Sequence, residues 1–287
     1  MTRTRKKRNS WKILLSCILL VAGVMGLNYL WACGGRNGGS VAMATPAAKM
    51  KAKERTVPLE RPGKLRGVPE LMLQKSQFLV SYNVERLCPN YVCWCLTKER
   101  VGGQVKRSNH FHADLEVEEA SRVESFDYAG SGYDRGHMCP AGDCKLTKVA
   151  MDESFGMTNI CPQNHDLNME AWNELEIQCR SWANNYGALY ICCGPMFSKT
   201  PAKTIGRRKG MRIAVPDAFF KVVLMMGRVP KAMGFVYPNQ ACEGDIRDYA
   251  VSVDEVERLT GFDFFVNLDD KQERLLEGEC NPAAWGI

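Results

Sequence analysis

Short apolar runs separated by glycine and proline dominate the chain after about residue 77, and this pattern predicts a sheet. Runs of this length that are rich in β-branched and aromatic residues are typical of strands. In the run 91–96, the odd-numbered and the even-numbered positions are both apolar, so we expect both faces of this strand to be covered. The predicted strands cover residues 78–82, 91–96, 188–193, 218–226 and 232–237, with a turn at Pro89-Asn90 between the first two.

Two segments have the periodicity of a helix instead. Between Asn168 and Tyr186 the apolar residues recur at spacings of three and four, which predicts one amphipathic helix. Ser252 and Glu255 form a capping box that begins a second helix, and Gly261 is suited to end it. Helices and strands follow one another without regular βαβ alternation. The predicted fold class is therefore α+β, with a mixed or antiparallel sheet as its core.

The first 72 residues lack this periodicity. Residues 1–33 carry six basic and no acidic side chains around an apolar run and end in Leu-Trp-Ala-Cys, which is typical of an export signal. The closing tetrad resembles the lipobox of bacterial lipoproteins, in which Cys33 would carry the lipid. An uncleaved membrane anchor and simple secretion are the alternatives. Residues 34–72, rich in Gly, Ala, Lys and Pro, predict a flexible tether, so residues 73–287 would form one folded domain.

The chain has 13 cysteines, 11 of them after Cys33. Each reading of the leader predicts an exported protein that is periplasmic, tethered to the membrane of the cell envelope, or secreted. In such a compartment cysteines form disulfides, and an odd number leaves at least one thiol unpaired. We expect Cys242 and Cys280 to pair. The close cysteine pairs lack the spacing of a zinc ribbon.

The net charge of +6 comes from the amino-terminal segments, because the chain from Leu71 onward is near −5. A general positive field that would attract nucleic acid is therefore absent, and any polyanion must be bound by a local patch. The candidate patch lies in segment 199–212, which could be a solvated loop or a phosphate-binding arm. Its six basic side chains, with no acid between them, are Lys199, Lys203, Arg207, Arg208, Lys209 and Arg212.

Candidate chemistry begins at Asp134-Arg135-Gly136-His137. An acid, a guanidinium that can hold a phosphate and a glycine that permits close approach precede the histidine. A histidine with a pKa near neutrality can remove a proton from water. On these four residues alone, a packed or surface histidine remains an open alternative.

A second cluster contains Asn168 and Glu176. Magnesium prefers hard oxygen ligands and keeps most of its waters, so one amide oxygen and a carboxylate nearby are sufficient. On one continuous helix the two residues would be about 12 Å apart along the axis. We therefore expect only Asn168 to bind an ion directly. A helix cap at Asn168 and a solvated surface position for Glu176 are the alternatives.

These motifs occur together in one known family. The run 133–143, with Asp-Arg-Gly-His near its start, resembles the signature of the DNA/RNA non-specific endonucleases, members of the ββα-metal group. The resemblance covers roughly residues 74–285 and implies a ββα-metal finger as the active site. Its further landmarks, in order, are residues 80–83, 106–114, 158–163, 167–176, 194–197, 215–221 and 260–265.

The resemblance implies hydrolysis of DNA and RNA with little sequence preference. His137 would be the general base, and Asn168 would be the single protein ligand of one Mg²⁺ or Mn²⁺ ion. Glu176 would hold a water on that ion.

The resemblance also implies roles around the phosphate. Arg107 would bind the scissile phosphate, and Arg135 would either join it or brace the site. Asn159 would help to orient the histidine, and Asp134 would be structural.

Cys139, Cys144 and Cys161 depart from the family pattern, and we expect a disulfide that braces the site rather than buried thiols. Two other classes of function remain open. One is an inactive nuclease-like module that binds nucleic acid at the cell envelope, and the other is a cysteine-based redox or metal protein.

Overall fold

The computed structural model describes residues 58–198 and 203–287. The predicted export signal with Cys33 and most of the predicted tether lie outside these residues. The chain divides into two units, residues 1–51 and 52–287, and all described residues belong to the second. Within the described part, no helix combines the length and the apolar character that crossing a bilayer requires.

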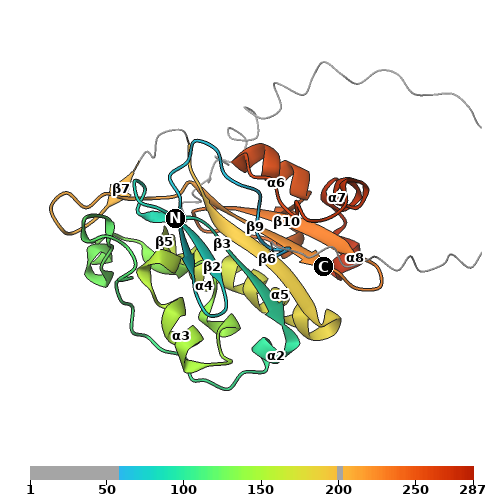
Figure 1. Ribbon diagram of the computed structural model, residues 1–287, viewed down its shortest axis with the longest axis horizontal. Coiled ribbons are helices and arrows are strands. Elements are labelled where there is room, and N and C mark those ends of the chain that lie inside the picture. The colour runs from blue at the N-terminus through green and yellow to red at the C-terminus, as the bar shows by residue number, and fades with distance from the viewer. Residues whose placement is uncertain (1–57, 199–202) are drawn as a thin grey trace, which may run out of the picture. The chain divides into compact units, whose positions relative to one another are not determined.

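A seven-stranded antiparallel sheet forms the centre of the described unit (Figure 1). Its order is β1-β2-β3-β6-β9-β10-β11. The strands are β1 Leu71–Gln74, β2 Leu79–Asn83, β3 Cys88–Thr97, β6 Ala188–Met196, β9 Ala218–Met225, β10 Lys231–Pro238 and β11 Ala250–Val251. Two smaller pairs are β4 Asp134–His137 with β5 Ile160–Gln163, and β7 Thr204–Ile205 with β8 Ile213–Ala214.

The predicted strands are confirmed, but the turn between the first two lies elsewhere. Pro89 and Asn90 are inside β3. The chain turns earlier, where the side-chain oxygen of Asn83 accepts hydrogen bonds from the backbone N–H groups of Glu85 and Arg86 (both 3.0 Å). An asparagine side chain that accepts a hydrogen bond from the backbone two residues later favours a turn, as a Pro-Asn pair does.

Both faces of the sheet are buried, as the pattern in 91–96 predicted. Val92 and Trp94 of β3 belong to the larger core, which also contains residues of the long helix α5 (Ala171–Tyr186). Tyr91 of β3 belongs to a second core on the opposite face, shared with α6 (Val253–Thr260). The sheet therefore separates two apolar layers, and α5 and α6 cover different faces.

The helix expected from Asn168 to Tyr186 is two helices. Helix α4 ends at Met169 and α5 begins at Ala171, because Glu170 has a non-helical backbone conformation (φ −112°, ψ −98°). The apolar periodicity continues across the break and conceals it. The helices are α2 Lys98–Val101, α3 Lys148–Ser154, α4 His165–Met169, α5 Ala171–Tyr186, α6 Val253–Thr260, α7 Asp270–Glu277 and α8 Pro282–Trp285.

The predicted ends of α6 are confirmed. The Ser252 hydroxyl accepts the Glu255 N–H (3.2 Å), and Gly261 ends the helix with a left-handed conformation (φ 74°). The Glu255 carboxylate, however, pairs with Arg258 instead of completing a capping box.

The folded part begins before residue 73, where the tether was predicted to end. Leu59 is buried in the second core, and the Gly63 N–H donates to the Asp263 carbonyl (2.7 Å). Strand β1 also starts at Leu71. A single buried leucine between polar residues has no periodicity, so the sequence pattern could not reveal this attachment.

Strands β4 and β5 and helix α4 form the predicted ββα finger. Asp134 pairs with Gln163 and His137 with Ile160 in the antiparallel register. The side chain of Gln163 is fully buried and packs directly over Gly136, where any β-carbon would collide with it. Glycine is therefore required at the position before His137 for the two strands to approach.

All 11 described cysteines are free thiols, so the disulfide predictions are wrong. The sulfur atoms of Cys139 and Cys144 are 3.6 Å apart, which is a thiol contact and not a bond of about 2.05 Å. Cys242 donates to backbone carbonyls, and Cys280 lies against Met233. Most of the thiols are packed in the cores as small apolar groups; only Cys280 is exposed and Cys95 half-buried.

Candidate active site

His137, at the end of β4, lies between two phenylalanine rings. Its ring centroid is 5.4 Å from that of Phe111 and 4.9 Å from that of Phe155, and the side chain is 7% exposed. Its Nε2 atom has no hydrogen-bond partner among the described residues. Burial, together with the charges of Arg107 and Arg135, lowers the pKa of His137 to about 3. The imidazole is therefore neutral at pH 7 and has an acceptor nitrogen available.

Asn159 holds the backbone that follows His137. Its Oδ1 accepts the Cys139 N–H (2.9 Å), and its Nδ2 donates to the carbonyls of Cys139 (2.8 Å) and Ser154 (2.9 Å). The asparagine is fully buried. All three contacts are with backbone, so Asn159 fixes the path of the chain beside the histidine.

Arg107 and Arg135 approach His137 through the rings that enclose it. The Arg135 guanidinium carbon lies 4.4 Å from the centroid of Phe111, and that of Arg107 lies 5.1 Å from the centroid of Phe155. Both arginines are exposed. Arg135 also donates to the Ser125 hydroxyl (2.6 Å). The structure thus brings two cations together at the rim of a buried, neutral histidine.

Asn168 is oriented by the acid at the other end of β4. Its Nδ2 donates to Asp134 Oδ2 (2.9 Å), and His165 Nδ1 contacts the same oxygen (2.9 Å). With the amide nitrogen directed at Asp134, the amide oxygen of Asn168 is left for a cation. Mg²⁺ and Mn²⁺ prefer hard oxygen ligands such as this amide oxygen. The residues present therefore fit the expected ion.

Glu176, on α5, sits in a network of charges. Burial raises its pKa to about 7, against the opposing effects of Lys221, Arg180 and Arg107. The Arg180 guanidinium lies 4.0 Å from the Glu176 carboxylate and 3.0 Å from that of Asp143. The charge of Arg107 acts on the pKa of both His137 and Glu176.

Lys221 extends this network into the core. It is a fully buried lysine on β9, and its Nζ lies 4.3 Å from the ring centroid of Trp172. Asp143 in turn accepts a hydrogen bond from Trp94 Nε1 (3.1 Å). Sequence reasoning missed Lys221, although a single charge inside the apolar run 218–225 is an unusual feature that marks a buried partner.

Three further residues of the site were also missed. Arg180 could have been found, because it follows Glu176 by four positions on one helix face. Phe111 and Phe155 give no comparable signal. Their contact with His137 depends on three segments that are distant in sequence.

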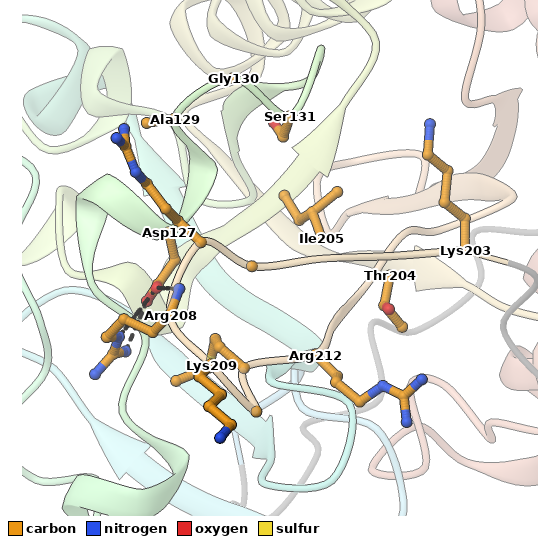
Figure 2. A pocket seen from close by; sticks show the side chains of 14 residues that line it. Asp127, Ala129, Gly130, Ser131, Lys203, Thr204, Ile205, Arg208, Lys209 and Arg212 are labelled. Carbon is orange, nitrogen blue, oxygen red and sulfur yellow. Dashed lines mark hydrogen bonds and ion pairs between the residues drawn. The ribbon is translucent and has the colours of Figure 1, made fainter.

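The predicted basic arm is only partly available to a ligand. Arg208 forms hydrogen bonds of 2.6–3.1 Å with the buried carboxylate of Asp127 and donates to the Arg122 carbonyl (2.6 Å). It therefore anchors the loop, and this pairing occupies much of the guanidinium that was predicted to bind substrate. Figure 2 shows this pair at one side of an open hollow of about 790 Å³. The other basic residues lining the hollow are Lys203, Arg207, Lys209 and Arg212, and Lys199 lies outside the described residues.

Residues 59–271 match the family model of the DNA/RNA non-specific endonucleases. The chain belongs to this family. Mitochondrial nuclease EXOG of Mus musculus is 33% identical over 211 residues, which cover 68% of this chain and 56% of that protein. Nuclease C1 of Cunninghamella echinulata var. echinulata is 34% identical over 217 residues, which cover 71% of this chain and 86% of that protein. The chain thus spans little more than half the length of the EXOG relatives.

A solved structure supports the same assignment. The crystal structure of the EndoG/EndoGI complex has a TM-score of 0.67 and 30% sequence identity, covering 74% of this chain and 90% of that chain. The shared architecture confirms the predicted α+β class with its ββα-metal finger.

The comparisons correct the predicted location. Nuclease EXOG of Homo sapiens, endonuclease G of Bos taurus and nuclease 1 of Schizosaccharomyces pombe are all named as mitochondrial. The prediction of an exported protein at the cell envelope is therefore wrong. Its basis was a basic leader without acids, and mitochondrial targeting segments share that composition with export signals.

Proposed function

We propose that the chain is a metal-dependent endonuclease that hydrolyses phosphodiester bonds in DNA and RNA with little sequence preference. The observation that carries the proposal is the state of His137, a neutral, buried imidazole with a free Nε2 between two arginines. A neutral histidine can accept a proton, and the arginines can hold the phosphate beside it. Membership of the endonuclease family supports this chemistry.

Phosphate binding would switch the histidine from a weak base to a stronger one. In the free protein, burial and the charges of Arg107 and Arg135 keep the pKa of His137 far below its usual value. A phosphodiester bound between the two guanidiniums would offset their charge. The pKa of His137 then rises toward neutrality, where an imidazole is an effective general base at pH 7.

In the reaction, His137 would take a proton from water as the water oxygen bonds to phosphorus. The bond from phosphorus to the 3′-oxygen breaks, which gives a 5′-phosphate and a 3′-hydroxyl. Glu176, with its pKa raised to about 7, is suited to hold a water and to supply the proton that the leaving oxygen needs. Arg107, whose charge acts on both His137 and Glu176, would stabilise the negative charge that develops on the phosphate.

Asn168 would hold a single Mg²⁺ or Mn²⁺ ion through its amide oxygen, with Asp134 fixing the orientation of that amide. Bound there, the ion would supply positive charge that offsets the charge of the phosphate in the transition state.

The open hollow offers a path for the rest of the nucleic acid. Lys203 lies over the ring of Tyr133, the residue before β4, so the hollow begins beside the finger. Arg207, Lys209 and Arg212 line it further on. Contacts of lysine and arginine with phosphates position a strand without reading its sequence, which suits a nuclease with little sequence preference.

Supercoiled plasmid and a structured RNA, incubated in parallel with Mg²⁺ or Mn²⁺, test the proposal. We expect both to be cut, and we expect a chelator to stop the cutting. Asn168→Ala should weaken metal binding and cleavage together, whereas Arg258→Ala, on α6 and paired with Glu255, should cut like the wild type. Binding of nucleic acid without cleavage by the wild type in either metal would instead support an inactive binding module.

A further inference from the structure

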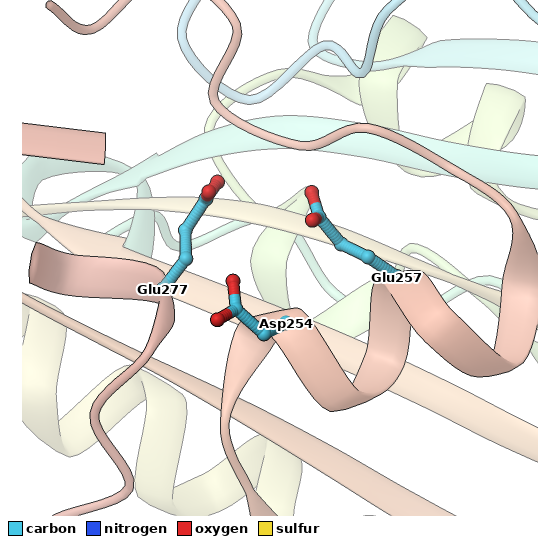
Figure 3. Close-up of side chains that lie close together, drawn as sticks. All are labelled: Asp254, Glu257 and Glu277. Carbon is cyan, nitrogen blue, oxygen red and sulfur yellow. The ribbon is translucent and has the colours of Figure 1, made fainter. Parts of the chain in front are cut away.

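Three carboxylates meet on the face of the sheet that α6 and α7 cover. Asp254 and Glu257 belong to α6, and Glu277 is the last residue of α7 (Figure 3). One oxygen from each lies within 4.8 Å of the other two. Both helices contact β10, and α6 packs in the second core, away from the core that contains α5. The group is therefore separate from the proposed active site.

Glu277 makes this group more than a cluster of surface acids. Its side chain is 5% exposed, and its buried Oε1 has no hydrogen-bond partner among the described residues. In Figure 3 its carboxylate extends toward the same space as that of Glu257. Glu257 is itself held in place, because its Oε1 accepts the Phe264 N–H (2.6 Å). A buried, unpartnered carboxylate aimed at two others requires a compensating charge or a proton.

The groups with the largest effects on Glu277 supply no such charge. Burial has the largest effect on its pKa, followed by the acids Glu257, Glu273, Asp254 and Asp263, and together they raise it to about 9. Burial and neighbouring acids also raise the pKa of Glu257 to about 7. Like charges at this separation repel one another strongly in a partly buried site.

We propose that Asp254, Glu257 and Glu277 bind one divalent cation, and that Ca²⁺ fits the site better than Mg²⁺. Calcium binds six to eight oxygens at about 2.3–2.6 Å, so oxygens up to about 4.8 Å apart can share one ion. Magnesium requires a tighter octahedron, with distances of about 2.0–2.1 Å. Asp254 is exposed, which gives the ion an entry and leaves room for water ligands. The cation joins the start of α6 to the end of α7 and is structural.

Calorimetric titration of the full chain with CaCl₂ tests the site, with Asn168→Ala as the background so that the proposed active site contributes no binding. We expect one Ca²⁺ per chain, with a dissociation constant in the range of about 10⁻⁵–10⁻³ M, and a melting temperature that rises with Ca²⁺. Asp254→Asn, an exposed position, should weaken binding about tenfold or more, and Glu277→Gln should abolish it. Glu255→Gln, an acid on the same helix that pairs with Arg258, should bind like the background.

Two results would overturn the proposal. One is the absence of Ca²⁺ binding and of any thermal shift in the background protein, with Glu277→Gln as stable as its parent, which would mean that Glu277 holds a proton instead. The other is Ca²⁺ binding that survives unchanged in both Asp254→Asn and Glu277→Gln. An equal affinity for Mg²⁺ would refute the preference for Ca²⁺. Plasmid cleavage by the wild type does not enter these readouts, so the proposed nuclease activity stands or fails separately.

Discussion

On the α5 face of the sheet, the partly exposed Glu176 and the buried Asp143 lie close to Arg180, and the charge of the buried Lys221 also acts on Glu176. On the α6–α7 face, the largest electrostatic effects on the buried Glu277 come from other acids. A group that takes part in proton transfer needs a defined protonation state, and nearby fixed charges of opposite sign can provide it. A carboxylate group without internal cations takes its compensation from solution, as a proton or as a metal ion. On the α5 face, fixed charges of the protein set the protonation state of the acids. On the α6–α7 face, the pH and the metal ions in solution would set it.

The largest expected effect comes from His137→Ala. Removing a general base lowers the rate by about 10²–10⁴-fold, and a plasmid-nicking time course at saturating Mg²⁺ measures it. The Ca²⁺-dependent thermal shift should stay at its wild-type value, because the acidic group lies on the other face. If His137→Ala also removed that shift, the two faces would not be independent.

Lys221→Met and Glu277→Gln compare the two faces directly, because each variant removes one buried ionisable side chain. Methionine is similar in volume to lysine but removes the buried cation beside Glu176 and Asp143. Breaking a buried ion network in this way costs about 3–5 kcal/mol, which urea unfolding would measure as a lower free energy of unfolding. With chelator present at pH 7, Glu277→Gln should change that free energy by less than about 0.5 kcal/mol, because the raised pKa keeps Glu277 protonated. Equal losses of the free energy of unfolding in Lys221→Met and Glu277→Gln would show that the two faces do not differ in this way.

The pH dependence of stability should have opposite signs on the two faces. The pKa of His137 falls from 6.5 to about 3 on folding, so the unfolded chain takes up a proton first as the pH drops. The wild type should therefore lose about 2 kcal/mol more than His137→Ala between pH 7 and pH 5. The pKa of Glu257 rises from 4.5 to about 7, so its contribution is lost as the pH increases through that range. Glu257→Gln should therefore lose less stability than the wild type as the pH rises from 4.5 to about 7. Urea unfolding in the presence of a chelator measures this difference.

The smallest expected effect concerns the basic hollow. Replacing Arg207 and Lys209 together by alanine should reduce the slope of log affinity against log salt for an inactive variant on DNA by about one unit per residue. Fluorescence anisotropy at several salt concentrations measures the slope. Arg258→Ala should leave it unchanged, since Arg258 lies on α6. A slope that stays at the wild-type value in the double variant would exclude the hollow as the strand path.

The sequence predicts local features well and distant pairings poorly. Short apolar runs between glycine and proline located the strands, and an ordered set of motifs identified the finger with His137 and Asn168. The pairing of Arg208 with Asp127 was missed because the two residues are 81 positions apart in the sequence. The break at Glu170 was missed because the apolar period runs through it. Both features become visible only once the chain is folded.

The same limit explains the cysteines. An expectation based on compartment favoured disulfides, whereas the pairing of two thiols depends on the separation of their positions in the fold. The three cysteines near the finger, Cys139, Cys144 and Cys161, occupy buried apolar positions as free thiols. A count of cysteines therefore says little without the packing around them.

The exposure of Cys280 has a practical consequence. Among the described cysteines it is the one exposed thiol, with Cys95 half-buried and the others enclosed in the cores. Among the described thiols, a maleimide dye should therefore attach first at Cys280 in the native protein. That position follows Glu277 by three residues, so a fluorophore there would report Ca²⁺ at the acidic group as a change in emission.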